Sequence, residues 1–193
     1  GFCLMELDKP HTAAYYLELR ASLDTTNVDW LMDAGGFYRE YIVDLSKALE
    51  YFQQGLRQSL LQYGEENAKT AMLYNYIGMV YSDQGDYEKA LDYYNKALNI
   101  RKTIFKEQHA DVAVSYNNLG VEYGKQGDYK KALEYYHQAL SIRLSIFGEQ
   151  HPDVALCYNN IGSVYSNQGE YEKALECFDK ALIINKALSG ENH

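Results

Sequence analysis

Three histidines recur at a fixed spacing, and a metal site is the first chemistry that such a set suggests. His109, His151 and His193 lie 42 residues apart along the chain. Zinc ligands must converge on one ion at about 2.0–2.3 Å, whereas packed helices have axes about 8–10 Å apart. Repeat-related histidines therefore cannot share an ion, and we expect them at helix starts or between repeats. The sequence predicts no metal site and no cofactor.

Catalytic chemistry is not indicated either. The recurring Gln-Gly-Asp-Tyr segment has neither the Walker nor the Rossmann glycine spacing, so it is not a phosphate-binding loop. The adjacent carboxylates Glu65 and Glu66 fall in a predicted linker, where a solvated loop explains them. No serine, histidine and aspartate set stands out from the repeated background. We therefore predict that the chain is not an enzyme.

The cysteines predict a reducing compartment. Cys3, Cys157 and Cys177 are odd in number and form no CxxC pair. Disulfide frameworks use an even number of cysteines, and zinc sites use cysteine pairs at short spacings. We expect all three to fill space in the core or at the surface of a cytoplasmic protein.

Composition narrows the choice of partner. The 193 residues carry a formal net charge of −9, which repels phosphate backbones, so nucleic acid is not an expected ligand. No apolar run approaches the roughly 18–20 residues that cross a bilayer, and no membrane association is expected. Tyrosine is unusually frequent, with 20 copies, and such amphipathic rings suit many helix–helix seams that lie near solvent.

An internal repeat organises the chain. Three units, 67–108, 109–150 and 151–192, align without a gap at an offset of 42 residues. Residues 25–66 form a diverged unit in which Gly36 lies 42 residues before Gly78, and Arg39 stands where the others have tyrosine. Residues 1–24 are expected to be the tail of a still earlier unit, and His193 to begin a further one.

Each unit is predicted to form a helical hairpin. In 109–150, Tyr116, Leu119, Gly120 and Tyr123 fall on one face of a first helix. Gly127 can end that helix in the left-handed conformation, and Asp128 can cap the second. A glycine inside a helix costs about 1 kcal/mol relative to alanine, so Gly120 is expected where the two helices approach closely. Stacked hairpins of this kind give an all-α solenoid that spans 1–193.

The repeated residues resemble the tetratricopeptide repeat (TPR). The pattern is Tyr-Asn-Asn-Leu-Gly, followed in register by Tyr, Gln-Gly-Asp-Tyr, Ala-Leu and Ala-Leu. The 42-residue period and the segment His-Pro-Asp-Val-Ala are similar to those of kinesin light chain repeats. The resemblance covers 67–192 strongly and 1–66 weakly. It implies a right-handed superhelix whose first helices line a concave groove that binds a peptide or a protein segment.

By the same resemblance, one face of each first helix lines this groove. The asparagines at one register could grip the backbone of an extended peptide, because an amide both donates and accepts hydrogen bonds; alternatively they tie neighbouring helices together or face water. Asn118 and Asn160 are expected to pack between repeats. The predicted groove residues are Asn75, Met79, Ser82, Asn117, Val121, Lys125, Asn159, Ser163 and Asn167.

Three functions remain open. The chain is predicted to be a scaffold or adaptor that binds a protein or peptide ligand; alternatively it is a regulatory or sensory arm of a larger signalling protein or enzyme. The third possibility is a self-associating scaffold. A trimmed C-terminus would expose the apolar flank around Leu175, Phe178 and Leu182, and self-association through that flank would then be an artefact of the trimming. The diverged Trp30–Tyr41 helix is either a special contact or a drifted repeat.

Overall fold

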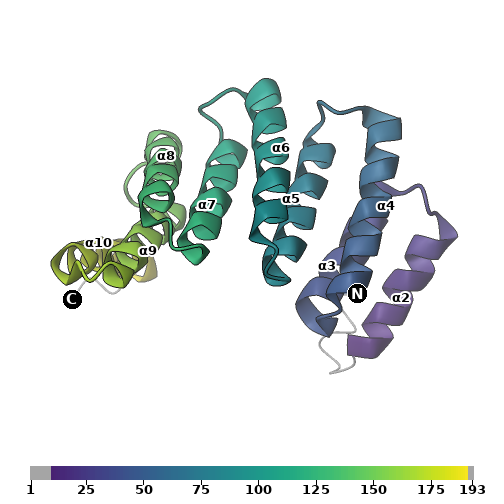
Figure 1. Cartoon of the computed structure of the whole chain (residues 1–193), viewed down its shortest axis with the longest axis horizontal. Coiled ribbons are helices and arrows are strands. Elements are labelled where there is room, and N and C mark those ends of the chain that lie inside the picture. Colours follow the sequence, from purple (N-terminus) through teal and green to yellow (C-terminus); the bar gives the residue numbers. More distant parts are fainter. Residues whose placement is uncertain (1–9, 191–193) are drawn as a thin grey trace. The chain divides into compact units, whose positions relative to one another are not determined.

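The computed structural model describes residues 10–190, in which short turns join a series of helices and no strand occurs (Figure 1). The predicted roles of Cys3, His193 and the first nine residues lie outside this range. The α-helices are α2 (Pro10–Leu23), α3 (Val28–Phe37), α4 (Leu45–Tyr63), α5 (Ala68–Asp83), α6 (Tyr87–Phe105), α7 (Ala110–Lys125), α8 (Tyr129–Phe147), α9 (Pro152–Asn167) and α10 (Tyr171–Ser189), and a π-helix, η1 (Tyr38–Ile42), follows α3.

The chain divides into two compact units, Gly1–Ile100 and Arg101–His193. In the second unit α7 packs against α8 and α9 against α10, as antiparallel hairpins (Figure 1). In the first unit α3 packs against α4, and α4 against α5. The predicted all-α hairpin architecture is confirmed in each.

The hairpin turns follow the predicted chemistry. Gly85, Gly127 and Gly169 adopt φ values of +79°, +79° and +78°, a left-handed conformation that ends a helix at low cost for glycine. Asp128 then caps α8 by accepting a hydrogen bond from the amide of Lys131 at 3.1 Å. The predicted roles of Gly127 and Asp128 are confirmed.

Glycines allow the two helices of a hairpin to approach. A Cβ on Gly120 would lie 2.7 Å from the ring of Tyr136, and a Cβ on Gly78 would lie 2.9 Å from the ring of Tyr94. The tyrosine ring of the second helix therefore lies directly over the glycine. The Cβ of Ala132 lies 3.9 Å from where a Cβ on Gly124 would lie, so the start of α8 also packs beside a glycine of α7.

The diverged repeat contains one extra residue, and this corrects its alignment. A Cβ on Gly35 would lie 2.7 Å from the ring of Phe52, while one on Gly36 would meet nothing within 4 Å. The close-approach glycine is thus Gly35 rather than Gly36. Tyr38, not Arg39, takes the place of the repeated tyrosine, because it stacks on Tyr51 with ring centroids 5.8 Å apart.

The π-helix η1 accommodates the extra residue. A π-helical turn adds one residue to a helix without changing the faces on either side of it. The register is restored at Asp44, which accepts a hydrogen bond from the amide of Lys47 at 2.9 Å and begins α4 as Asp128 begins α8. An offset of 42 therefore aligns α4 with α6 of the next repeat, whereas an offset of 43 aligns α3 with α5.

Candidate functional site

The first helices of the second unit, α7 and α9, begin with histidine caps. His109 Nδ1 accepts a hydrogen bond from the backbone amide of Asp111, and His151 Nδ1 accepts one from the backbone amide of Asp153. The nitrogen–nitrogen distance is 3.1 Å in each. Each imidazole also stacks on the last aromatic residue of the preceding helix, with ring centroids 4.1 Å apart. The predicted helix-start role is confirmed for both histidines. Pro152 occupies the first helical position, as expected.

In the second unit, a buried arginine fastens α7, and another fastens α9, to the helical segment that precedes it. Arg143 Nη1 on α8 donates to the carbonyl oxygen of Asp153 at 3.1 Å and contacts Cys157 Sγ at 3.2 Å. Arg101 Nη1 donates to Asp111 O at 3.3 Å and to Ser115 Oγ at 2.7 Å. Cys157 thus fills core space as predicted, and burial raises the pKa of its thiol.

A second polar cluster braces the start of α7. Tyr116 donates its hydroxyl to Glu107, and Lys102 pairs with the same carboxylate at 2.9 Å. Hydrogen bonds from Tyr116 and Lys102 lower the pKa of Glu107, while burial raises the pKa of Tyr116. In the next repeat Leu144 replaces the lysine, and a hollow of about 260 Å³ lies there between Leu144, Glu149, Tyr158 and Lys180.

The predicted groove positions of α7 and α9 are accessible. Asn117, Val121 and Asn159 are half-buried, while Lys125, Ser163 and Asn167 are exposed. The residues of each set recur every four positions, so each set lies along one face of its helix. The face offers amides, one hydroxyl and one ammonium group beside the apolar Val121, and Ser163 Oγ donates to the carbonyl of Asn159 at 2.9 Å.

One hydrogen bond connects α9 directly to α7. Asn160 Nδ2 donates to Asn117 Oδ1 at 2.9 Å. The predicted packing role of Asn160 between repeats is confirmed, and the oxygen of Asn117 takes part in the same contact. Asn117 therefore has the inter-helix role that was the alternative to ligand binding. In residues 10–190, by contrast, no intramolecular hydrogen bond is formed by the side chain of Asn159.

The equivalent face of α5, in the first unit, is more buried. Asn75 and Ser82 are each only 7% exposed, and Asn75 Nδ2 lies 3.4 Å from the sulfur of Met79, which is half-buried. Little of these side chains can contact a ligand. The adjacent Asp83 accepts a hydrogen bond from Arg39 Nε at 2.7 Å, which links the π-helix to the end of α5.

Sequence reasoning missed two charged residues near the predicted face. Arg39 was treated only as a departure from the repeat, yet it forms the ion pair with Asp83. Glu122, next to Val121, is fully buried. An offset of 42 places Glu122 where the other units have Val80 and Val164, and this comparison could have identified it.

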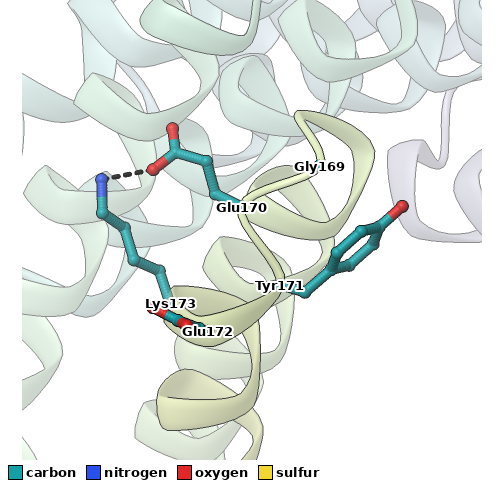
Figure 2. Close-up of a pocket in the computed structure, with 5 residues that line it drawn as sticks. All are labelled: Gly169, Glu170, Tyr171, Glu172 and Lys173. Atoms are coloured by element: carbon teal, nitrogen blue, oxygen red, sulfur yellow. Dashed lines mark ion pairs between the residues drawn. The ribbon is translucent and has the colours of Figure 1, made fainter.

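The hollow drawn in Figure 2 lies at the last hairpin turn. It measures about 460 Å³ and is lined by consecutive residues, from Gly169 to Lys173. Lys173 pairs with Glu170 on one side, while Tyr171 points away from this pair. A shallow site made by one turn offers a charged pair and a phenol but no nucleophile with a base beside it.

Neither metal-binding nor membrane-spanning features occur in the described part. Among residues 10–190 no three histidine, cysteine, aspartate or glutamate side chains come together as a metal-ion cluster. No helix in that range has the length and apolar character of a membrane span.

Known structures of similar fold were found by comparison. BtubC (BKLC) from P. vanneervenii is 32% identical, with a TM-score of 0.77 over 84% of this chain and 65% of that chain, so this chain spans just under two thirds of its length. The nearly identical TPR-like repeats of a putative kinesin light chain from Podosopora anserina are 15% identical, with a TM-score of 0.76 over 95% of this chain and 90% of that chain. RapI in its apo form is 24% identical, with a TM-score of 0.78 over 98% of this chain and 68% of that chain.

Sequence comparisons give the family. A search of curated protein sequences gives no match. The family model described as tetratricopeptide repeat matches residues 37–103, 70–145 and 111–187, which together cover well over half of the chain. With the hairpins, turn glycines and helix caps described above, these matches show that the chain belongs to the tetratricopeptide-repeat family.

Proposed function

We propose that the chain is a protein-interaction module that binds an extended segment of a partner protein along the exposed face of α7 and α9. The observation that carries this proposal is the side-chain chemistry of that face. The side chain of Asn159 is accessible and makes no hydrogen bond within residues 10–190, and Lys125, Ser163 and Asn167 are exposed beside it. Amides that present both donors and acceptors can bind a peptide backbone irrespective of its side chains.

The apolar and small residues of this face determine which side chains the bound segment of the partner can carry. Val121 and Gly124 are half-buried, and Ser163 is exposed, so bulky side chains of an extended ligand have space between the amides. Lys125 is the one basic residue at the predicted positions, so a ligand rich in carboxylates is disfavoured. An adaptor or scaffold role follows, without catalysis by this chain.

A binding comparison with a matched control tests the proposal. The chain and its Asn159→Ala/Ser163→Arg variant would be used to capture partners from lysate of the source cells, with identification by mass spectrometry. Glu134→Arg, an equally exposed change on α8, serves as the control. We expect a partner that the parent and the control retain and the Asn159→Ala/Ser163→Arg variant loses. Equal capture by all three would refute binding at this face.

A regulatory arm of a larger protein is the second candidate. It is supported by partial coverage of a longer chain, because this chain spans 65% of BtubC (BKLC). The same face would then bind a segment of the larger protein itself. An output domain encoded in the same gene would favour this candidate over a free-standing adaptor.

A further inference from the structure

A hollow of about 260 Å³ lies in the second unit, where the end of α8 meets α9 and α10. Its polar lining comes from Glu149 in the loop after α8, Tyr158 of α9 and Lys180 of α10. The remaining lining residues are Leu144, Gln150, Ile183 and Ile184. The hollow thus places a carboxylate, a phenol and an ammonium group beside apolar side chains.

The preceding repeat has an additional lysine at the equivalent place. Three residues there lie 42 positions before their counterparts at the hollow; the pairs are Lys102 and Leu144, Glu107 and Glu149, and Tyr116 and Tyr158. Lys102 Nζ lies 2.9 Å from a carboxylate oxygen of Glu107 and 3.4 Å from the hydroxyl oxygen of Tyr116. The Tyr116 hydroxyl donates to Glu107. An ammonium group therefore completes a cluster with a carboxylate and a phenol.

The last repeat keeps the carboxylate and the phenol but has lost that ammonium group, because Leu144 replaces the lysine. Within residues 10–190, neither the carboxylate of Glu149 nor the hydroxyl of Tyr158 takes part in a hydrogen bond or an ion pair. Glu149 is exposed and Tyr158 is half-buried, so solvent reaches both. These two groups are therefore available to a cation from outside the chain.

Lys180 does not take the place of the missing lysine. Its ammonium group lies over the ring of Tyr158, 5.5 Å from the centroid, where the face of the ring attracts a cation. Within the described residues it forms no ion pair with Glu149. The equivalent residue of α8 is the neutral Gln138, so the cluster of the preceding repeat has only one ammonium group.

The hollow is not on the face that the next repeat covers. Lys180 and Ile183, which are exposed, correspond to Gln138 and Ser141 of α8. Both of those residues are exposed as well, although α8 packs against α9. The accessibility of Lys180 and Ile183 is therefore a property of their place in the repeat.

We propose that this hollow binds the side chain of a lysine from a partner protein. The ammonium group of that lysine lies between Glu149 and Tyr158, as the ammonium group of Lys102 does in the preceding repeat. Its aliphatic stem packs against Leu144 and Ile183, since a lysine buries its methylene groups while its charged end stays polar. The hollow shares no residue with the proposed peptide-binding face of α7 and α9, so this contact does not depend on the proposed function.

Titration with short peptides tests the need for a positive charge. The probes are peptides capped at both ends and otherwise uncharged, with lysine, ε-acetyl-lysine or norleucine at the centre. NMR spectra of the isotope-labelled whole chain follow the backbone amides of Glu149 and Lys180. We expect these signals to shift with the lysine peptide, with a Kd of about 1 mM, and not with the other two. No shift with the lysine peptide, or equal binding of the norleucine peptide, overturns the proposal.

Substitutions at the hollow test the position of the ligand. Leu144→Lys restores the internal lysine of the preceding repeat and is expected to abolish binding of the lysine peptide, with unchanged helical circular dichroism. Glu149→Gln is expected to weaken binding about tenfold, whereas Lys180→Gln removes a like charge and is expected to strengthen it. Glu134→Gln, an exposed change elsewhere on α8, is the control and should bind as the parent does. Parent-like binding by Leu144→Lys or by Glu149→Gln overturns the proposed site.

Discussion

At the scale of the residue, the least expected feature is Val43. The hairpin turns of the later repeats have glycine at this position, whereas Val43 adopts φ +59° and ψ +31° and is 70% exposed. A β-branched residue in the left-handed region is strained, by about 1–3 kcal/mol. Val43 follows the π-helix and lies two residues after the exposed Tyr41. The turn of the diverged repeat therefore exposes apolar side chains where the later repeats have a glycine between polar residues.

Val43→Gly should stabilise the first unit. Glycine adopts positive φ without a steric penalty, although it loses more backbone entropy on folding, so the net gain is expected to be about 1 kcal/mol. Urea unfolding followed by circular dichroism measures it. Val114→Gly, in the second turn of α7, is the control and should destabilise by about 0.5 kcal/mol or more, because glycine has a lower helix propensity than valine and removes a side chain that is only 36% exposed. A loss of stability in Val43→Gly would contradict the claim that the positive φ of Val43 destabilises the folded state.

Glu18 gives a pH-dependent prediction. It accepts hydrogen bonds from Lys47 and Tyr38, and these bonds lower its pKa in the folded state. Folding is then stabilised above the unfolded pKa of about 4.3, and this contribution is lost as pH falls through the lower folded value. Glu18→Gln should therefore be less stable than the parent at neutral pH.

The measurement is urea unfolding of both proteins from neutral to acidic pH. The difference between Glu18→Gln and the parent should shrink toward zero below the folded pKa, because the parent carboxyl is then neutral as well. The pKa of Lys47 is raised by the same contacts, so its charge stays constant over this range. A difference that does not change with pH would show that the Glu18 charge contributes nothing.

At the scale of the element, sequence periodicity predicted the hairpins but not the register of the diverged one. The 42-residue offset located α7 to α10, the caps of α7, α8 and α9, and the turn glycines, because each repeat has the same local chemistry. It misaligned α3, since adjacent glycines at 35 and 36 both fit a one-letter pattern. Only the packing of the Phe52 ring distinguishes them, and that contact is not local in sequence.

Alanine substitutions of the glycines test this register. Gly120→Ala forces a Cβ to within 2.7 Å of the Tyr136 ring and should destabilise the protein by about 1–3 kcal/mol. Gly36→Ala meets no atom and should stabilise α3 by about 0.5–1 kcal/mol, from helix propensity alone. Thermal unfolding of the two variants compares them. A destabilised Gly36→Ala would restore the original alignment.

The candidate site was only partly predictable. The sequence placed Asn117 and Asn159 on one face, and the structure keeps both accessible, yet it engages the oxygen of Asn117 with Asn160 and buries Asn75. Whether an asparagine binds a neighbouring helix or faces outward depends on the distance between helices of different repeats. Periodicity within one repeat carries no information about that distance.

At the scale of the whole molecule, stability should be distributed by repeat. In the second unit α8 packs against α9, so loss of that junction should loosen the last hairpin and leave remote helices intact. Arg143 is a sharp test, because its guanidinium is buried and joins α8 to the start of α9. Hydrogen bonds that involve a charged group contribute about 1.5–3 kcal/mol each.

Arg143→Met keeps most of the apolar stem and removes the guanidinium. Hydrogen exchange followed by mass spectrometry should show faster exchange in α9 and α10, while α3 to α5 exchange as in the parent. Arg57→Met on α4, which replaces an exposed arginine, should leave all helices unchanged. Uniformly faster exchange along the chain in Arg143→Met would instead mean that both compact units unfold as one cooperative structure. Unchanged exchange in α9 would mean that apolar packing alone holds that junction.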